Sequence, residues 1–301
     1  SSLLPKELNR LDLILGAIVL GIFSGGVYAL MASGLTLIFG VMDIINVGQG
    51  ALVVLGAYLS YELAVKMHID PFLGLLVTMP LMFLLGVFIE IVFIRRLKRE
   101  RTMLSILVTF AVALIIEGVL GLIFTTNYVE IPAWYVNDSF PLGGTYVAYI
   151  YVFAFALSVV LLGGLYLLLY RTKFGHALRA TMQNRVAAEL IGIDVGRVSA
   201  ITFGVGVALA AAGGMAFGAI NQFDPGSSYD LISRLLVIII LGGMGSLAGA
   251  LIASLFMLVI EDVTAVVWSP IWATTVFFVL LAVVLLIRPR GLFGQLEARR
   301  Q

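Results

Sequence analysis

The sequence has no cysteine and few charged residues. The absence of cysteine excludes disulfide frameworks, thiolate metal sites and a cysteine nucleophile. Lysine, arginine, aspartate and glutamate together make up 12% of the 301 residues, about half the share that is typical of a soluble domain. So low a charge content excludes an ordinary soluble globule.

Apolar residues take the place of the missing charges. They account for 61% of the chain, and the mean hydropathy is +1.12. A soluble protein of this length could not bury so much apolar surface, so the composition predicts an all-α integral membrane protein. Glycine contributes 32 residues, and glycine lets membrane helices pack closely.

The lengths of the apolar runs predict the membrane spans. The runs cover residues 11–32, 33–47, 49–65, 72–94, 103–125, 148–170, 198–220, 231–243, 245–262 and 271–287. A spanning helix needs about 20 apolar residues, so we interpret 33–47 and 231–243 as half-helices and expect about eight full spans. Broken helices at membrane depth require protein or a cavity to satisfy their backbone, which favours a transport pathway.

The basic residues fall almost entirely on one predicted side of the membrane. They are Lys6, Arg10, Arg95, Arg96, Lys98, Arg99, Arg101, Arg171, Lys173, Arg179, Arg185, Arg197, Arg288, Arg290, Arg299 and Arg300. The segment 126–147 has acidic residues but no cation. By the positive-inside rule we expect both termini to be cytoplasmic and 126–147 to be external, and an even number of crossings agrees with this.

Two stretches of the chain resemble each other at a nearly constant offset. The matching pairs are Gly25-Gly26 with Gly213-Gly214, Gly48-Gln49-Gly50 with Gly243-Met244-Gly245, Pro71 with Pro270, and Arg95 with Arg288. Within a single domain, 1–301, these matches predict a parallel internal repeat. The first copy covers 11–97 and the second 198–294, with connecting helices at 103–170 and a cytoplasmic loop at 171–197. The alternative is that glycine-rich apolar sequence aligns easily with itself.

The chemistry of an enzyme is not indicated. The two histidines, His68 and His176, fall in predicted loops on opposite sides of the membrane, so they cannot share a metal or an active site. The nucleophile elbow, the phosphate-binding loop and the HExxH zinc motif are absent from the sequence. We therefore expect no catalytic residue, no metal and no cofactor in this chain.

Polar side chains inside the predicted spans are candidates for function, because burying them is costly. Glu117 lies in the span 103–125. It is either hydrogen-bonded to a neighbouring helix or a residue of a solute or ion pathway. Asn46 and Gln49 flank the first glycine turn. They either satisfy the freed backbone there or bind a polar solute.

The loop 171–197 is the most informative segment outside the membrane. From Gly175 to Leu190 it has helical composition, with alanines among basic and amide side chains. An alanine-rich helix at the cytoplasmic face offers a smooth surface to a partner protein. The same segment could instead lie on anionic lipid, and composition leaves the two possibilities open.

At this loop the sequence resembles the permease subunits of ABC importers, whose coupling helix carries an E-A-A-x-x-x-G pattern. Ala187, Ala188 and Gly192 match the pattern, whereas Val186 stands in place of the usual glutamate. The wider resemblance is to the LivH-type branched-chain amino acid permease family. It rests on Gly175-x-Ala177-Leu178-Arg179-Ala180, Gln183-Asn184, Ile45-Asn46, Gly56-Ala57-Tyr58, Gly242-Gly243-Met244-Gly245-Ser246-Leu247 and Arg288-Pro289-Arg290-Gly291-Leu292-Phe293-Gly294.

The resemblance implies a permease subunit of a bacterial inner-membrane ABC importer. Its partners would be a homologous second permease, two ATPase subunits, a periplasmic or lipid-anchored solute-binding protein and membrane lipid, with no nucleic acid. The ATPase would contact Arg179, Asn184, Ala187, Ala188, Glu189 and Gly192, and the solute path would include Asn46, Gln49, Glu117 and Ser246.

The first glycine turn departs from the family pattern in a way that bears on the solute. Gln49 replaces the usual histidine, and Ala51 stands where an acidic residue is common. The wider family also moves urea, amides and aromatic carboxylates, so the solute stays open between branched-chain amino acids and other small polar solutes. The competing hypothesis is a stand-alone, proton-coupled secondary transporter that uses Glu117.

Overall fold

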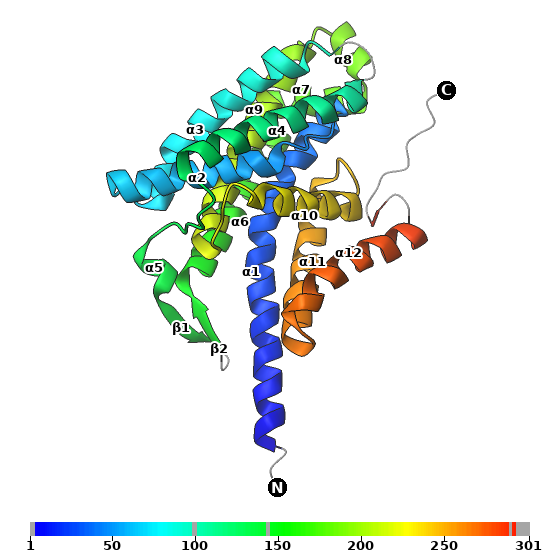
Figure 1. Cartoon of the computed structure of the whole chain (residues 1–301). Coiled ribbons are helices and arrows are strands. Elements are labelled where there is room, and N and C mark those ends of the chain that lie inside the picture. The colour runs from blue at the N-terminus through cyan, green and yellow to red at the C-terminus, as the bar shows by residue number, and fades with distance from the viewer. Residues whose placement is uncertain (1–3, 98–100, 143–144, 289–290, 293–301) are drawn as a thin grey trace.

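Long apolar helices make up most of the computed structural model, which describes residues 4–97, 101–142, 145–288 and 291–292 (Figure 1). In this part of the chain, eight helices are long and apolar enough to cross a membrane. They are α1 (Leu4–Met42), α2 (Gln49–Met67), α3 (Pro71–Ile89), α4 (Arg101–Phe124), α6 (Tyr149–Arg171), α9 (Val195–Ile220), α11 (Leu247–Val267) and α12 (Pro270–Ile287). The eight predicted full spans are confirmed, and the protein is a multi-pass, all-α membrane protein.

Shorter elements connect the long helices. A π-helical turn, Glu90–Ile94, extends α3, and α5 (Trp134–Asn137) precedes a hairpin of β1 (Ser139–Leu142) and β2 (Thr145–Ala148). Two short helices, α7 (Lys173–Gln183) and α8 (Arg185–Leu190), form the loop between α6 and α9. The helix α10 (Ser227–Gly242) confirms that the segment predicted at 231–243 is a short helix.

The first predicted half-helix, 33–47, is wrong. Helix α1 continues without a break to Met42, so its 39 residues extend over about 58 Å at 1.5 Å per residue. Its glycines serve close helix contacts rather than turns. A Cβ atom on Gly34 would lie 2.5 Å from the Gly206 carbonyl oxygen of α9, and one on Gly40 would lie 2.6 Å from the Met182 methyl group of α7.

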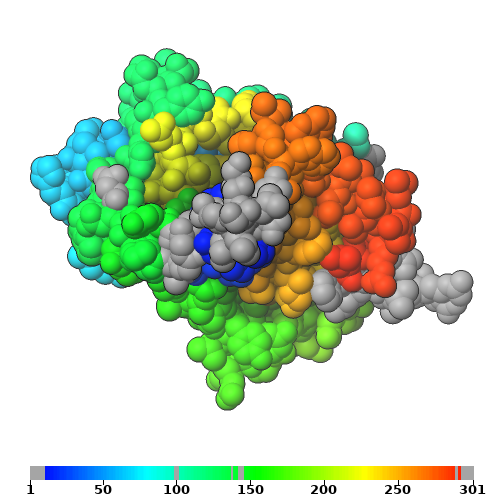
Figure 2. All heavy atoms as spheres, turned by 90° about the horizontal axis from the view of Figure 1, so that it is seen from below, coloured from blue at the N-terminus to red at the C-terminus, as the bar shows by residue number. Residues whose placement is uncertain are grey.

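The two ends of the described chain lie at opposite ends of α1. Helix α11 runs antiparallel to α1, because Gly21 packs against Val259 whereas Gly40 lies beside Gly245. The Leu292 N–H donates to the Leu241 carbonyl oxygen at 2.7 Å, at the same end as Gly245. Figure 2, seen from below, shows the blue early part of α1 near the middle of this face. The described ends, Leu4 and Leu292, therefore do not share the one side that we expect for the two termini, and the termini themselves lie outside the described residues.

Helix α9 forms the centre of the bundle. Of its most apolar 18-residue window, 83% is buried, the largest share among the candidate spans of the described chain. It packs against α1, α2 and α3 through small residues. A Cβ atom on Gly214 would collide with the Val53 carbonyl oxygen of α2, and one on Gly86 of α3 would lie 2.9 Å from the Gly204 Cα atom. Close backbone contact of this kind suits a membrane, where lipid tails are as apolar as leucine.

The predicted repeat describes only part of this arrangement. Helices α2 and α11 both follow a glycine turn and run in the same direction, and α3 and α12 both begin with a proline at the first helical position. A parallel repeat requires matching helices to run in the same direction, and the match of Gly25-Gly26 with Gly213-Gly214 does not meet this requirement. These pairs lie in α1 and α9, which are antiparallel, since Gly34 meets Gly206 and Met31 meets Gly213.

We expect Gly214→Ala to lower the free energy of unfolding by about 1–3 kcal/mol, because the added methyl group forces α2 away from α9. Gly118→Ala is the matched control. Gly118 lies on α4, and a Cβ atom there would meet no other atom within 4 Å. The higher helix propensity of alanine should therefore raise the free energy of unfolding by up to about 1 kcal/mol. Thermal unfolding in detergent micelles measures both variants. Equal midpoints would contradict the assigned contact between α2 and α9.

Candidate functional site

The break between α1 and α2 holds two of the predicted site residues. Asp43 ends α1 with a φ of 56°, and the chain is non-helical up to Gly48. The Asn46 Nδ2 atom donates to Gln49 Oε1 at 3.0 Å, and Gln49 Nε2 donates to the Gly206 carbonyl oxygen at 3.3 Å. Both amide side chains are buried. In this conformation the two amides hydrogen-bond to each other, and Gln49 also hydrogen-bonds to the backbone of α9.

The same break is fastened to α4. The Val47 N–H donates to Thr109 Oγ1 at 3.1 Å, and Thr102 Oγ1 donates to the Asp43 carbonyl oxygen at 2.9 Å. Gly48 lies against the Thr109 carbonyl, where a Cβ atom would approach to 2.8 Å. These contacts supply partners for backbone groups that would otherwise be unpaired at membrane depth.

Glu117 and Ser246 have other partners. Glu117 lies on α4, about 12 Å along the helix from Thr109, and is hydrogen-bonded to the side chain of Tyr229 on α10. Its Oε2 atom is buried and has no hydrogen-bond partner among the described residues. Ser246 begins α11, where its hydroxyl accepts from the Gly249 N–H at 3.1 Å. The structure therefore brings Asn46 and Gln49 together and assigns Ser246 a capping role.

The loop 171–197 folds into two helices joined at Asn184. The Thr172 hydroxyl caps α7 by accepting from the Gly175 N–H at 3.0 Å, and Asn184 Oδ1 caps α8 by accepting from the Ala187 N–H at 3.0 Å. Helix α7 packs on the end of α1 through Met182. Helix α8 lies at the top of the molecule in Figure 1, beyond the ends of the long helices.

Gly192 ends α8 for a conformational reason. Its φ is 87°, a left-handed conformation that favours glycine. The Ile193 N–H donates to the Ala188 carbonyl oxygen and the Gly192 N–H to that of Glu189, which is the Schellman arrangement. The glycine of the A-A-x-x-x-G pattern is thus the residue that stops this helix.

The surface of α8 is apolar and exposed. Leu190 is 83% exposed and Ile191 74%, and Ala187 and Glu189 are also exposed, whereas Ala188 is buried against the bundle. Of the predicted coupling residues, Arg179 points back to the bundle. Its guanidinium lies 4.8 Å from the centre of the Tyr170 ring, and Nη2 is 2.8 Å from His176 Nδ1.

An intramembrane ion cluster was not anticipated from the sequence. Arg234 of α10 donates through Nη1 to both carboxylate oxygens of Glu261 at 2.6 Å, and through Nε to Asp230 at 2.8 Å. Its side chain is only 14% exposed, and the Phe277 ring of α12 lies 5.7 Å from the guanidinium carbon. The signal was present, since Arg234 interrupts the apolar run 231–243 and Glu261 lies within 245–262. A charge inside a span is a functional candidate by default.

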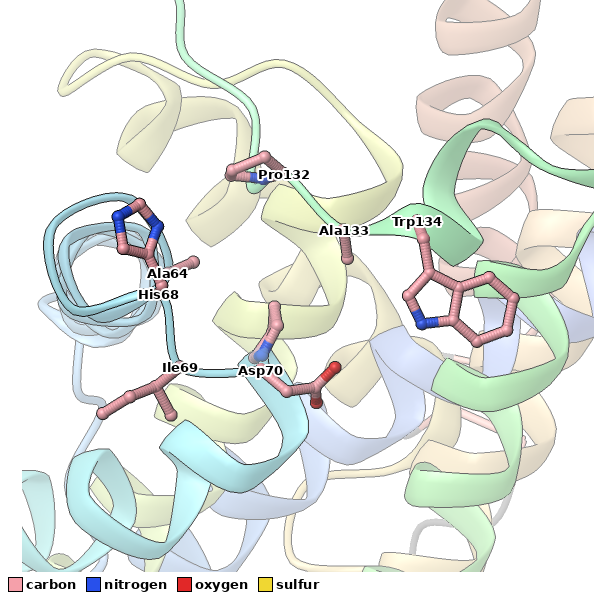
Figure 3. Close-up of a pocket in the computed structure, with 8 residues that line it drawn as sticks. Ala64, His68, Ile69, Asp70, Pro132, Ala133 and Trp134 are labelled. Carbon is pink, nitrogen blue, oxygen red and sulfur yellow. The ribbon is translucent and has the colours of Figure 1, made fainter.

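A shallow depression of about 520 Å³ lies at the end of the molecule away from α8. It is lined by the α2–α3 turn and residues 132–134 (Figure 3). Asp70 caps α3 by accepting from the Phe72 N–H, and its other oxygen accepts from the Tyr135 hydroxyl at 3.1 Å. Burial and the nearby Asp70 carboxylate raise the pKa of Tyr135 above its ordinary value, so this phenol stays protonated and donates.

Comparison with known proteins adds evidence from sequence. Residues 17–286 match the family described as "Branched-chain amino acid transport system / permease component". The chain is similar to the high-affinity branched-chain amino acid transport system permease protein BraD of Pseudomonas aeruginosa, with 28% identity over 94% of this chain and 96% of the relative. It is also similar to the probable branched-chain amino acid transport permease protein LivH of Methanocaldococcus jannaschii, with 29% identity over 97% and 95%. A third relative is the LivH permease protein of Escherichia coli, with 26% identity over 93% and 95%. No solved structure matches the chain.

Gln49→Leu is expected to lower the free energy of unfolding by about 1–3 kcal/mol, because it leaves the Asn46 amide and the Gly206 carbonyl without these partners inside the bundle. Asn221→Leu is the control, since Asn221 is exposed and makes only a local bond to the Phe217 carbonyl oxygen. Its effect should stay within about 0.5 kcal/mol. Thermal unfolding of the purified chain would refute the network if the two variants behaved alike.

Glu261→Leu should cost about 3–5 kcal/mol, because it leaves the buried Arg234 guanidinium with too few partners. The double variant Arg234→Met, Glu261→Leu removes both charges and should recover most of that loss. Together with the single variant Arg234→Met, these variants form a double-mutant cycle, and their unfolding midpoints measure the coupling between Arg234 and Glu261. If the effects of the two single variants simply added up in the double variant, the ion pair would not be formed.

Proposed function

The chain belongs to the family of permease components of branched-chain amino acid transport systems, and on that premise we propose that it is the membrane-spanning permease subunit of an ATP-driven importer. It would take up branched-chain or related amino acids, or other small polar, amide or aromatic carboxylate solutes. ATP hydrolysis would take place on separate subunits that bind the loop 171–197.

The observation that carries this proposal is helix α8. It is capped at both ends, projects beyond the bundle and presents Leu190 and Ile191 to solvent. Large exposed apolar side chains outside a membrane indicate a surface that a partner protein covers. Helix α7 then connects that surface to the bundle, because Met182 contacts Gly40 at the end of α1. Movement of the ATPases as they close would be transmitted from α8 through α7 to α1 and the other spanning helices.

The proposed docking site also orients the protein in the inner membrane. The end that carries α7 and α8 would be cytoplasmic, together with Leu292 and the turn at Gly245. The end at which α1 begins, together with 126–147, would face outward. A periplasmic or lipid-anchored binding protein would approach this outward end, where the depression beside Asp70 lies. A homologous second permease would complete the path through the membrane, and lipid would cover the apolar faces.

The solute path would include Asn46, Gln49, Glu117 and Ser246. In the described conformation the Asn46–Gln49 pair is closed on Gly206, so contact with solute requires this turn to open. The ATPases would have to bind the open and closed states with different affinity, since a ligand shifts an equilibrium only by that difference. Because most side chains in the spans are apolar, selection among solutes would depend mainly on the binding protein.

We expect Leu190→Asp to abolish co-purification of the ATPase subunits and to reduce ATP-driven uptake at least tenfold, because a charge replaces an apolar contact at the docking surface. The fold should be unaffected, since this side chain is 83% exposed. Tyr146→Asp, at the opposite end and 73% exposed, should retain the ATPases. Retention of the ATPases by Leu190→Asp would exclude α8 as the docking helix.

The competing function, a proton-coupled carrier, depends on Glu117 and on broken helices, of which one is absent. We expect this chain alone in proteoliposomes to move no solute under a proton gradient, and the assembled importer to continue uptake when a protonophore is added. Uptake by the chain alone that a protonophore and Glu117→Gln both abolish would establish the carrier instead.

A further inference from the structure

The ion cluster in the outer half of the bundle has the groups needed to bind a small zwitterion. We propose that Arg234, Asp262 and Tyr28 form a binding site for the carboxylate and ammonium groups of an α-amino acid on its way through the membrane. This inference rests on the proposed import function, and it assigns to three residues a role outside the path named above.

Five helices meet at this site. Tyr28 comes from α1, Arg234 from the first half of α10 and Asp262 from the last two turns of α11. The phenol of Tyr151 on α6 lies within the electrostatic influence of Asp262, and Phe277 of α12 lies beside the guanidinium. A site between helices that belong to different parts of the bundle can open and close when those helices move.

The charges of the cluster do not balance. Arg234 is the cation, and Asp230, Glu261 and Asp262 are the carboxylates that act on it. Arg234 is hydrogen-bonded to Asp230 and Glu261, whereas Asp262 has no hydrogen bond or ion pair within the described part of the chain. An unpaired carboxylate in a half-buried position of a spanning helix is costly, and a ligand ammonium group would compensate it.

Arg234 keeps donors available for the other end of such a ligand. Nε and Nη1 are used by Asp230 and Glu261, and Nη2 donates to none of the residues that the structure describes. The N–H groups of Nη2 can donate charge-assisted hydrogen bonds to a carboxylate oxygen. The cluster therefore offers a donor for a carboxylate and an acceptor for an ammonium group, as the two ends of an α-amino acid require.

Tyr28 supplies an independent observation. Its side chain is only 7% exposed, and its hydroxyl lies within the electrostatic influence of Arg234, Asp230, Glu261 and Asp262. No described residue is its hydrogen-bond partner. Its oxygen is not among the fully buried atoms that lack a partner, so this hydroxyl, beside the charged cluster, is free to donate to a group that is bound during transport. A metal ion is not indicated, since the carboxylates do not converge as metal ligands in the described ranges.

The test uses the assembled permease–ATPase complex in lipid nanodiscs, without the binding protein, and radiolabelled leucine as the probe. Two competitors separate the charges: 4-methylpentanoate lacks the ammonium group, and 3-methylbutylamine lacks the carboxylate. In the wild-type complex, unlabelled leucine should displace the probe far better than either analogue. Tyr28→Phe should weaken leucine binding about 10- to 100-fold, the usual effect of losing a hydrogen bond to a charged group.

Asp262→Asn should act on specificity. Without this carboxylate the ammonium group is no longer recognised, so 4-methylpentanoate should compete as well as leucine does. Glu62→Gln is the control, because Glu62 pairs only with the exposed Lys66 one turn away. Tyr28→Phe removes a hydroxyl that makes no bond in the fold, so its effect cannot be attributed to misfolding.

Two results would overturn the proposal. One is unchanged leucine affinity and unchanged discrimination in both variants, and the other is the absence of saturable leucine binding to the wild-type complex. ATP-driven leucine uptake by the full importer, measured in parallel, separates the two levels of inference. Uptake that persists in both variants with an unchanged dependence on leucine concentration removes the site and leaves the importer in place. Absence of ATP-driven uptake by the wild type of leucine and of every other solute class named above removes both.

Discussion

The need of backbone N–H and C=O groups for hydrogen-bond partners wherever the chain leaves a helix governs the structure around residues 43–48. The chain leaves the helix there, so its N–H and C=O groups need partners from neighbouring helices. Thr102 and Thr109 of α4 provide some of them, and the Asn46–Gln49 pair links the turn to the Gly206 carbonyl of α9. The position of α4 and the contact between α2 and α9 therefore depend on one short irregular segment.

Close packing between helices follows from the same environment. Lipid tails are as apolar as the helices they surround, so helix association depends on contact and on hydrogen bonds rather than on the hydrophobic effect. Glycine allows α9 to approach α1, α2 and α3 closely enough for direct contact between backbones. Several buried serines and threonines bond to carbonyl groups of their own helix, whereas the amide turn at Asn46 and the charged cluster around Arg234 link different helices.

The sequence predicts the spans well and their three-dimensional relations poorly. The length of an apolar run is a local property, and all eight full spans were found from it. The break that the short run 33–47 predicted is absent, because Gly34 and Gly40 each face another helix, and such a partner is invisible in a linear sequence. Arg234 and Glu261 are 27 positions apart, so their pairing is a tertiary fact, although each charge stands out in its own apolar run.

The unbroken length of α1 has a mechanical consequence. A helix of 39 residues, held at one end by Met182 of α7 and along its side by α9 and α11, behaves as a stiff rod of about 58 Å. A displacement at one end must appear at the other without a hinge to absorb it. Equilibrium coupling between two sites is reciprocal. Under the proposed function, α1 would therefore transmit ATPase binding at α8 to the outer end, and solute binding at the outer end back to α8.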